Sequence, residues 1–137
     1  MLPLLLLFLH LAANFAWIGS IVAVGLIAGG TSSSAKERGL LALGVYRMVA
    51  VPALLVSVSA GTARLFLSLP AYFSESHFMH AKLTFAVVVI ALHHIIGARV
   101  KRLARGELNA FDRGPLLSVL LLLAATVTAF FAVYKPF

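Results

Sequence analysis

The sequence predicts an all-α integral membrane protein: one domain of four transmembrane helices, with both termini on the non-cytoplasmic side. Hydrophobic residues make up 62% of the 137 residues and charged residues 11%, whereas a soluble domain has roughly 25% charged residues. The apolar residues form four long blocks, and a spanning helix needs about 20 such residues. Because only helices and closed barrels satisfy their backbone groups in lipid, these blocks predict helices.

The four predicted spans are separated by short breaks and cover about residues 2–28, 40–69, 77–98 and 115–134. The first span contains no charged side chain, and the run Gly29–Ser34 ends it. The third span runs into a basic segment, residues 99–105. Pro115 opens the fourth span, where its fixed backbone angle suits a first helical turn.

The basic side chains indicate how the spans are oriented. In a four-span protein the first and third loops lie on one side, and most basic residues gather there: Lys36, Arg38, Arg99, Lys101, Arg102, Arg105 and Arg113. The other side has Lys135, and Arg64 can extend toward it. The positive-inside rule then places both termini of this multi-pass protein away from the cytoplasm. The net charge of +7 is thus explained by topology, without a nucleic acid partner.

Several polar side chains lie inside the predicted spans, where an ionisable group is costly and usually functional. Depth follows from the helical rise of about 1.5 Å per residue, counted from the cytoplasmic end of each span. His10 and His80 each lie about 29 Å up, near the outer edge of the hydrocarbon. The polar residues therefore form an outer group (His10, His80, Lys82) and an inner group (Arg47, His93, His94).

Helical spacing adds the direction in which these residues face. His10, Asn14 and Trp17 follow i, i+4, i+7 spacing and form one stripe. Two histidines at matched depth on neighbouring helices can ligate a haem iron from both sides. We therefore expect His10 and His80 to be the metal ligands, with Asn14, Trp17 and His93 beside the cofactor. The alternative is that these histidines form hydrogen bonds between helices or lie at the membrane interface.

Arg47 and Lys82 are cations without an acidic partner in any predicted span. A buried cation needs an anion, and the propionates of a porphyrin would supply one. Arginine binds such a carboxylate through two parallel hydrogen bonds. Both residues are therefore candidates for cofactor binding and for catalysis through substrate binding. The alternative is that their side chains extend to lipid phosphates.

Three segments carry a family resemblance. They are Phe8–His10 with Trp17; Tyr46–Pro52 with Ser57 and Gly61; and Met79–Leu83 with His93 and Gly97. Together with Pro115 and the ending Lys135–Phe137, they resemble the HemJ-type protoporphyrinogen IX oxidases and their relatives with CopD-like domains. The resemblance implies a small helical bundle that binds haem b and oxidises protoporphyrinogen IX, passing electrons to a quinone or a respiratory partner. The family's histidine and His-x-Lys segment fall on His10, His80 and Lys82.

The sequence leaves other functions open. The family has an aromatic segment with a proline–arginine pair where this chain has the small and aliphatic residues Gly19–Gly25, so the chain could keep the haem and lack the oxidase activity. It would then be a b-type cytochrome, a homo-oligomer or an accessory subunit of a larger complex, with close helix contacts at small residues of the first span: Gly19, Ala23, Gly25 and Ala28. A further alternative is copper handling by His77, Met79 and His80. The chain has no cysteine, which excludes disulfides and thiol catalysis.

Overall fold

The protein is all-α, with four helices long and apolar enough to cross a membrane. The computed structural model describes residues 1–67, 73 and 78–134. In chain order the elements are α1 (Leu2–Gly29), α2 (Ala35–Val45), the π-helical turn η1 (Tyr46–Ala50), α3 (Val51–Leu67), α5 (Phe78–Ala104) and α6 (Gly114–Tyr134). Large apolar side chains are exposed along all four spans, including Leu4, Phe15, Leu55, Val87 and Leu123. This surface suits lipid, and the predicted all-α fold of four helices that could span a membrane is confirmed.

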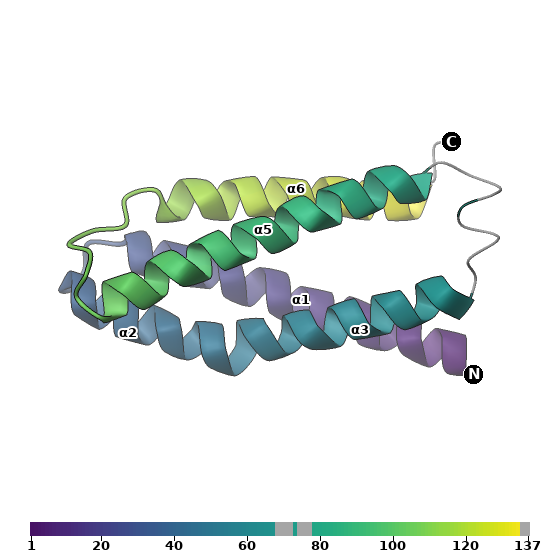
Figure 1. The fold of residues 1–137 in the computed structure, drawn as a ribbon, viewed down its shortest axis with the longest axis horizontal. Helices are drawn as coiled ribbons and strands as arrows, with labels where there is room; N and C mark the ends of the chain where they lie inside the picture. Colours follow the sequence, from purple (N-terminus) through teal and green to yellow (C-terminus); the bar gives the residue numbers. More distant parts are fainter. Residues whose placement is uncertain (68–72, 74–77, 135–137) are drawn as a thin grey trace.

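The four spans run side by side, and the first turn of α1 and the last turn of α6 lie at the same end (Figure 1). The opposite end carries the connection from α1 to α2 and the connection from α5 to α6 (Figure 1). Most of the basic residues therefore gather at one end of the bundle, as the sequence predicts. The second predicted loop, residues 70–76, lies outside the described residues except for Phe73.

Two helices are longer than their apolar blocks, because local capping decides where they begin and end. Ser34 and Glu37 form a capping box: Ser34 Oγ accepts from the Glu37 N–H at 3.2 Å, and Glu37 Oε2 accepts from the Ser34 N–H at 3.0 Å. The second span therefore begins at Ala35, not at about residue 40. The third span continues to Ala104, not 98, and ends where Gly106 adopts a positive φ of 74°.

The second span contains one wide turn, η1, immediately before Pro52. A proline inside a helix has no N–H, and its ring collides with the carbonyl four residues earlier. In η1 the Val51 N–H instead bonds the Tyr46 carbonyl, five residues back. π-turns of this kind occur frequently at functional sites, and this one holds Tyr46 and Arg47.

Glycines allow the helices to approach one another within the bundle. A methyl group on Gly25 of α1 would lie 3.0 Å from the Gly114 carbonyl oxygen of α6 and would also collide with Ser118. Ser118 Oγ donates to the Val22 carbonyl at 3.2 Å across the same contact. By contrast, Gly19 is exposed and has open space around it. The buried Gly25 of the first span is therefore used in packing within this chain, whereas the exposed Gly19 is not, and the accessory-subunit alternative stays a prediction.

The contact between α2 and α5 gives a direct test of this packing. A methyl group on Gly39 would lie 2.5 Å from the Ala104 backbone nitrogen, so Gly39→Ala must push two backbones apart. We expect a loss of about 1–3 kcal/mol in the free energy of unfolding, measured by denaturation in mixed micelles. Gly44→Ala, on the same helix with open space around it, is the control, and we expect it to be neutral or stabilising by up to about 1 kcal/mol. Equal effects of the two variants would contradict the close contact.

The helices diverge beyond η1. The α2 helix packs against α5, whereas α3 packs mainly against α1, and α5 crosses over to pack against α6 (Figure 1). The space between the η1–α3 segment and α5 is therefore lined by side chains from both sides. This space is the inner of the two candidate sites described next.

Candidate functional site

The His10 ring is held between α1 and α3. Its Nδ1 lies 2.8 Å from the Ser57 carbonyl oxygen, and its Nε2 lies 3.1 Å from Asn14 Nδ2. Ser57 Oγ donates to Asn14 Oδ1 at 2.8 Å and so orients the amide. A methyl group on Gly61 would lie only 2.8 Å from the His10 ring, so the glycine lets the ring pack against α3. We name these four residues, His10, Asn14, Ser57 and Gly61, the His10 cluster.

The hydrogen bonds decide which nitrogen of His10 carries the proton. A carbonyl oxygen can only accept, so Nδ1 is the donor and Nε2 of the neutral ring has the lone pair. Histidines that bind metals are usually oriented in this way, with one ring N–H donated to a carbonyl or carboxylate. The residues therefore fit iron ligation through Nε2, provided that the Asn14 amide moves aside.

The other outer candidates lie at the same end of the bundle as His10. His80 is in the first turn of α5, where its side chain is exposed and its ring lies 5.4 Å from the Phe73 ring. Lys82 lies two positions after His80 on α5, Arg64 lies in the last turn of α3, and both cations contribute positive electrostatic potential at His10. This places two cations near the predicted haem ligand.

Two of the three residues proposed for copper, Met79 and His80, differ in exposure. The Met79 side chain is buried, the neighbouring His80 is exposed, and His77 lies outside the described residues. Among the described residues no group of three or more His, Cys, Asp or Glu side chains could hold a metal ion. Copper handling by His77, Met79 and His80 therefore stays a prediction.

The stripe predicted on the first helix divides between two clusters. Trp17 does not join His10 and Asn14: its indole Nε1–H donates to His93 Nδ1 on α5 at 3.1 Å. His93 is fully buried, and the Tyr46 ring is stacked on it with centroids 5.0 Å apart. Gly97, four residues after His93, makes room for the Tyr46 ring, because a methyl group there would overlap it. Trp17, Tyr46, His93 and Gly97 form the His93 cluster.

His93 has the opposite tautomer to His10. An indole N–H can only donate, so Nδ1 of His93 accepts and the proton of the neutral ring is on Nε2. Within the described structure this Nε2 is buried and has no hydrogen-bond partner. If His93 lies beside a cofactor, as predicted, it can therefore donate a hydrogen bond to it through Nε2 but cannot ligate its metal.

A groove of about 450 Å³ adjoins this cluster, between the η1–α3 segment and α5. Polar and apolar side chains line it: Tyr46, Arg47, Val51, Leu54, Leu55, His93, His94 and Lys101. The Lys101 ammonium lies 5.6 Å from the centre of the Tyr46 ring. Arg47 and His94 are exposed at the protein surface. Arg47 is therefore not buried inside the protein, as its interpretation as a buried charge assumed. The wide turn η1 places its side chain at the rim of the groove.

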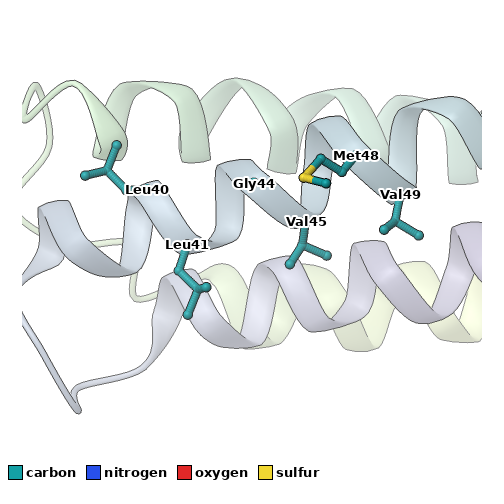
Figure 2. Close-up of a pocket in the computed structure, with 6 residues that line it drawn as sticks. All are labelled: Leu40, Leu41, Gly44, Val45, Met48 and Val49. Carbon is teal, nitrogen blue, oxygen red and sulfur yellow. The ribbon is translucent and has the colours of Figure 1, made fainter.

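A second groove, of about 360 Å³, has no comparable chemistry. Six residues of α2 and η1 line it: Leu40, Leu41, Gly44, Val45, Met48 and Val49 (Figure 2). None of them carries a charge or a hydrogen-bonding side chain that could recognise a ligand. An acyl chain is the occupant that such a surface suits.

Tyr46, Ser57 and Lys101 were not predicted as site residues from the sequence. Gly61 and Gly97 entered the sequence analysis only through the family resemblance. Helical spacing contains a signal for them. Gly61 follows Ser57 by four positions and Gly97 follows His93 by four, so each glycine lies on the same face as a buried polar residue. A glycine at that spacing indicates that another side chain crosses the helix there.

Compared with known proteins, the chain matches no family model, no curated protein and no solved structure.

Proposed function

We propose that this protein binds haem b in the membrane and takes part in electron transfer, most specifically as a protoporphyrinogen IX oxidase-like oxidoreductase of the plasma (inner) membrane. The observation that carries the proposal is the His10 ring, whose Nδ1–H is bonded to the Ser57 carbonyl while its Nε2 lone pair contacts only a side-chain amide. A histidine oriented in this way is prepared for a metal. Haem b, when bound, supplies one-electron transfer.

The chain's own residues have separate roles in this proposal. His10 and His80 would hold the iron, and Lys82 with Arg64 would neutralise porphyrin propionates at the outer end. Arg47 cannot share that role at His10, because its neighbours in the groove are His93 and His94. The sequence suggested the propionate contact for both Arg47 and Lys82; we keep it for Lys82 and assign Arg64 in place of Arg47. Both termini lie on the non-cytoplasmic side in this proposal, by the positive-inside rule.

Consumption of protoporphyrinogen IX tests the enzymatic part of the proposal. Purified protein in lipid nanodiscs should oxidise it to protoporphyrin, without oxygen, when a quinone accepts the electrons and protons. Arg64→Gln and Lys82→Gln should each lower kcat/KM by about tenfold, because each removes a charge-assisted contact to a propionate. Arg102→Gln is the control, since Arg102 is paired with Glu107 at the opposite end.

Two results would contradict different parts of the proposal. A haem-loaded protein that leaves porphyrinogen unchanged with every quinone tested would be a non-catalytic b-type cytochrome. Activity that is the same in the Arg64, Lys82 and Arg102 variants would contradict the propionate contact. The small and aliphatic residues Gly19–Gly25, where the resembled family has an aromatic segment, are the feature that favours the cytochrome alternative.

A further inference from the structure

The groove beside the His93 cluster contains a hydrogen-bond donor that the proposed haem site does not use. His93 is fully buried, its Nδ1 is occupied by Trp17, and its Nε2 has no partner in the described part of the chain. More than about nine in ten buried polar groups are paired in native proteins, and an unpaired one costs about 1–3 kcal/mol. The arrangement therefore calls for an acceptor atom from outside the chain.

The walls of the groove restrict what this acceptor belongs to. Tyr46 presents an aromatic ring, and Val51, Leu54 and Leu55 present aliphatic side chains. The volume of about 450 Å³ is within the range of about 300–1,000 Å³ that is usual for small-molecule sites. A flat, apolar ligand with one acceptor oxygen suits these walls.

The rim of the groove carries positive charge. Arg47 and Lys101 line it, and the ion pairs among the described residues, Arg102 and Arg105 with Glu107, lie outside it. Positive charge near an acceptor favours an oxygen that is rich in electrons. A phosphate would be held by these rim cations in the hydrated headgroup region, and it would leave the buried His93 donor unpaired.

We propose that the groove binds the ring of a lipid-soluble quinone, with one ring carbonyl accepting the His93 Nε2–H. The ring packs against Tyr46 and the aliphatic wall, and the isoprenoid chain leaves through the lipid-facing opening. Trp17 acts as a positioning residue, because its N–H holds His93 in the tautomer that donates through Nε2. The quinone's role as electron acceptor rests on the proposed function, whereas its binding requires no haem.

The single tryptophan of the chain makes the binding measurable. Trp17 is hydrogen-bonded to His93, so a quinone on His93 should quench its fluorescence. We would titrate decylubiquinone into the protein in phosphatidylcholine nanodiscs, recording Trp17 emission and the quinone retained after gel filtration. Wild-type protein should show saturable quenching and retain quinone.

Variants of His93 separate the hydrogen bond from simple partition into lipid. His93→Gln keeps an acceptor for Trp17 and an N–H for the ligand, and its affinity should stay within about threefold of wild type. His93→Phe removes the donor and should weaken binding by about tenfold. Lys101→Gln should weaken binding less than His93→Phe, and Arg99→Gln, on the same helix but outside the groove, should leave it unchanged.

Three results would overturn the proposal. One is quenching that rises linearly with quinone and is equal in all variants, because it would reflect collisions in the bilayer. Another is emission that responds only to phosphatidylglycerol and depends on Arg47 and Lys101 but not on His93, which would make the groove a lipid-headgroup site. If His93→Phe does not fold, Leu55→Phe fills the groove from its exposed wall. Unchanged quinone retention by that variant is the third contrary result.

Discussion

Replacing His10 by alanine is expected to abolish haem b binding. The ring is the one imidazole of the His10 cluster, and its orientation is fixed by the Ser57 carbonyl. Loss of a residue that merely orients a metal ligand costs about 10–100-fold in metal affinity, so loss of the ligand itself should weaken haem binding by at least that factor and leave little haem after purification. The haem-to-protein ratio is measured from the Soret absorbance and the protein concentration after purification.

Matched variants distinguish ligand loss from general damage to the bundle. Asn14→Ala should retain haem, because Asn14 contacts the Nε2 lone pair that the iron would use. Gly61→Ala should lower haem content while leaving the helices intact, because its methyl group would press on the His10 ring. If His93→Ala or His94→Ala removes the haem and His10→Ala does not, the cofactor lies in the inner groove and our assignment fails.

Gly97→Ala is expected to cause a large loss of stability, comparable with that of Gly39→Ala. The added group would overlap the ring of Tyr46, which lies against Gly97 and is stacked on His93 of the same helix. Forcing a ring out of a packed interior costs about 1–3 kcal/mol, occasionally more. Denaturation in mixed micelles measures the loss, and the Trp17 emission should shift as its His93 partner moves.

A double-mutant cycle shows whether Tyr46 is the cause. In the Tyr46→Ala background the ring is gone, so Gly97→Ala should lose most of its effect. Tyr46→Phe keeps the ring and should keep the effect of Gly97→Ala in full. An effect of Gly97→Ala that is the same with and without the Tyr46 ring would contradict the packing described for the His93 cluster.

The architecture could be predicted from the sequence because lipid imposes one strong rule. Blocks of apolar residues with so few charges must be helices, and the breaks at Gly29–Ser34 and after Arg105 separate them clearly. The helix ends were harder to predict, because hydropathy contains no information about capping. Ser34 with Glu37 and Gly106 extended two helices into the basic segments.

The site was only partly predictable, because helical spacing gives the face of a residue but not its partner. The stripe of His10, Asn14 and Trp17 is present on α1, yet α3 receives its first two members and α5 the third. The position of Pro52 was visible in the sequence, but not the five-residue hydrogen bond before it that places Arg47 at the rim of a groove. Such pairings depend on how four helices diverge, which no single segment specifies.

The measurement that tests the account most directly is the spectrum of the wild-type protein, purified in detergent after expression with ample haem. The account predicts haem b in about stoichiometric amount, with the low-spin absorption and electron paramagnetic resonance spectra that two histidine ligands produce. A colourless protein, or a bound haem that remains high-spin, would contradict it.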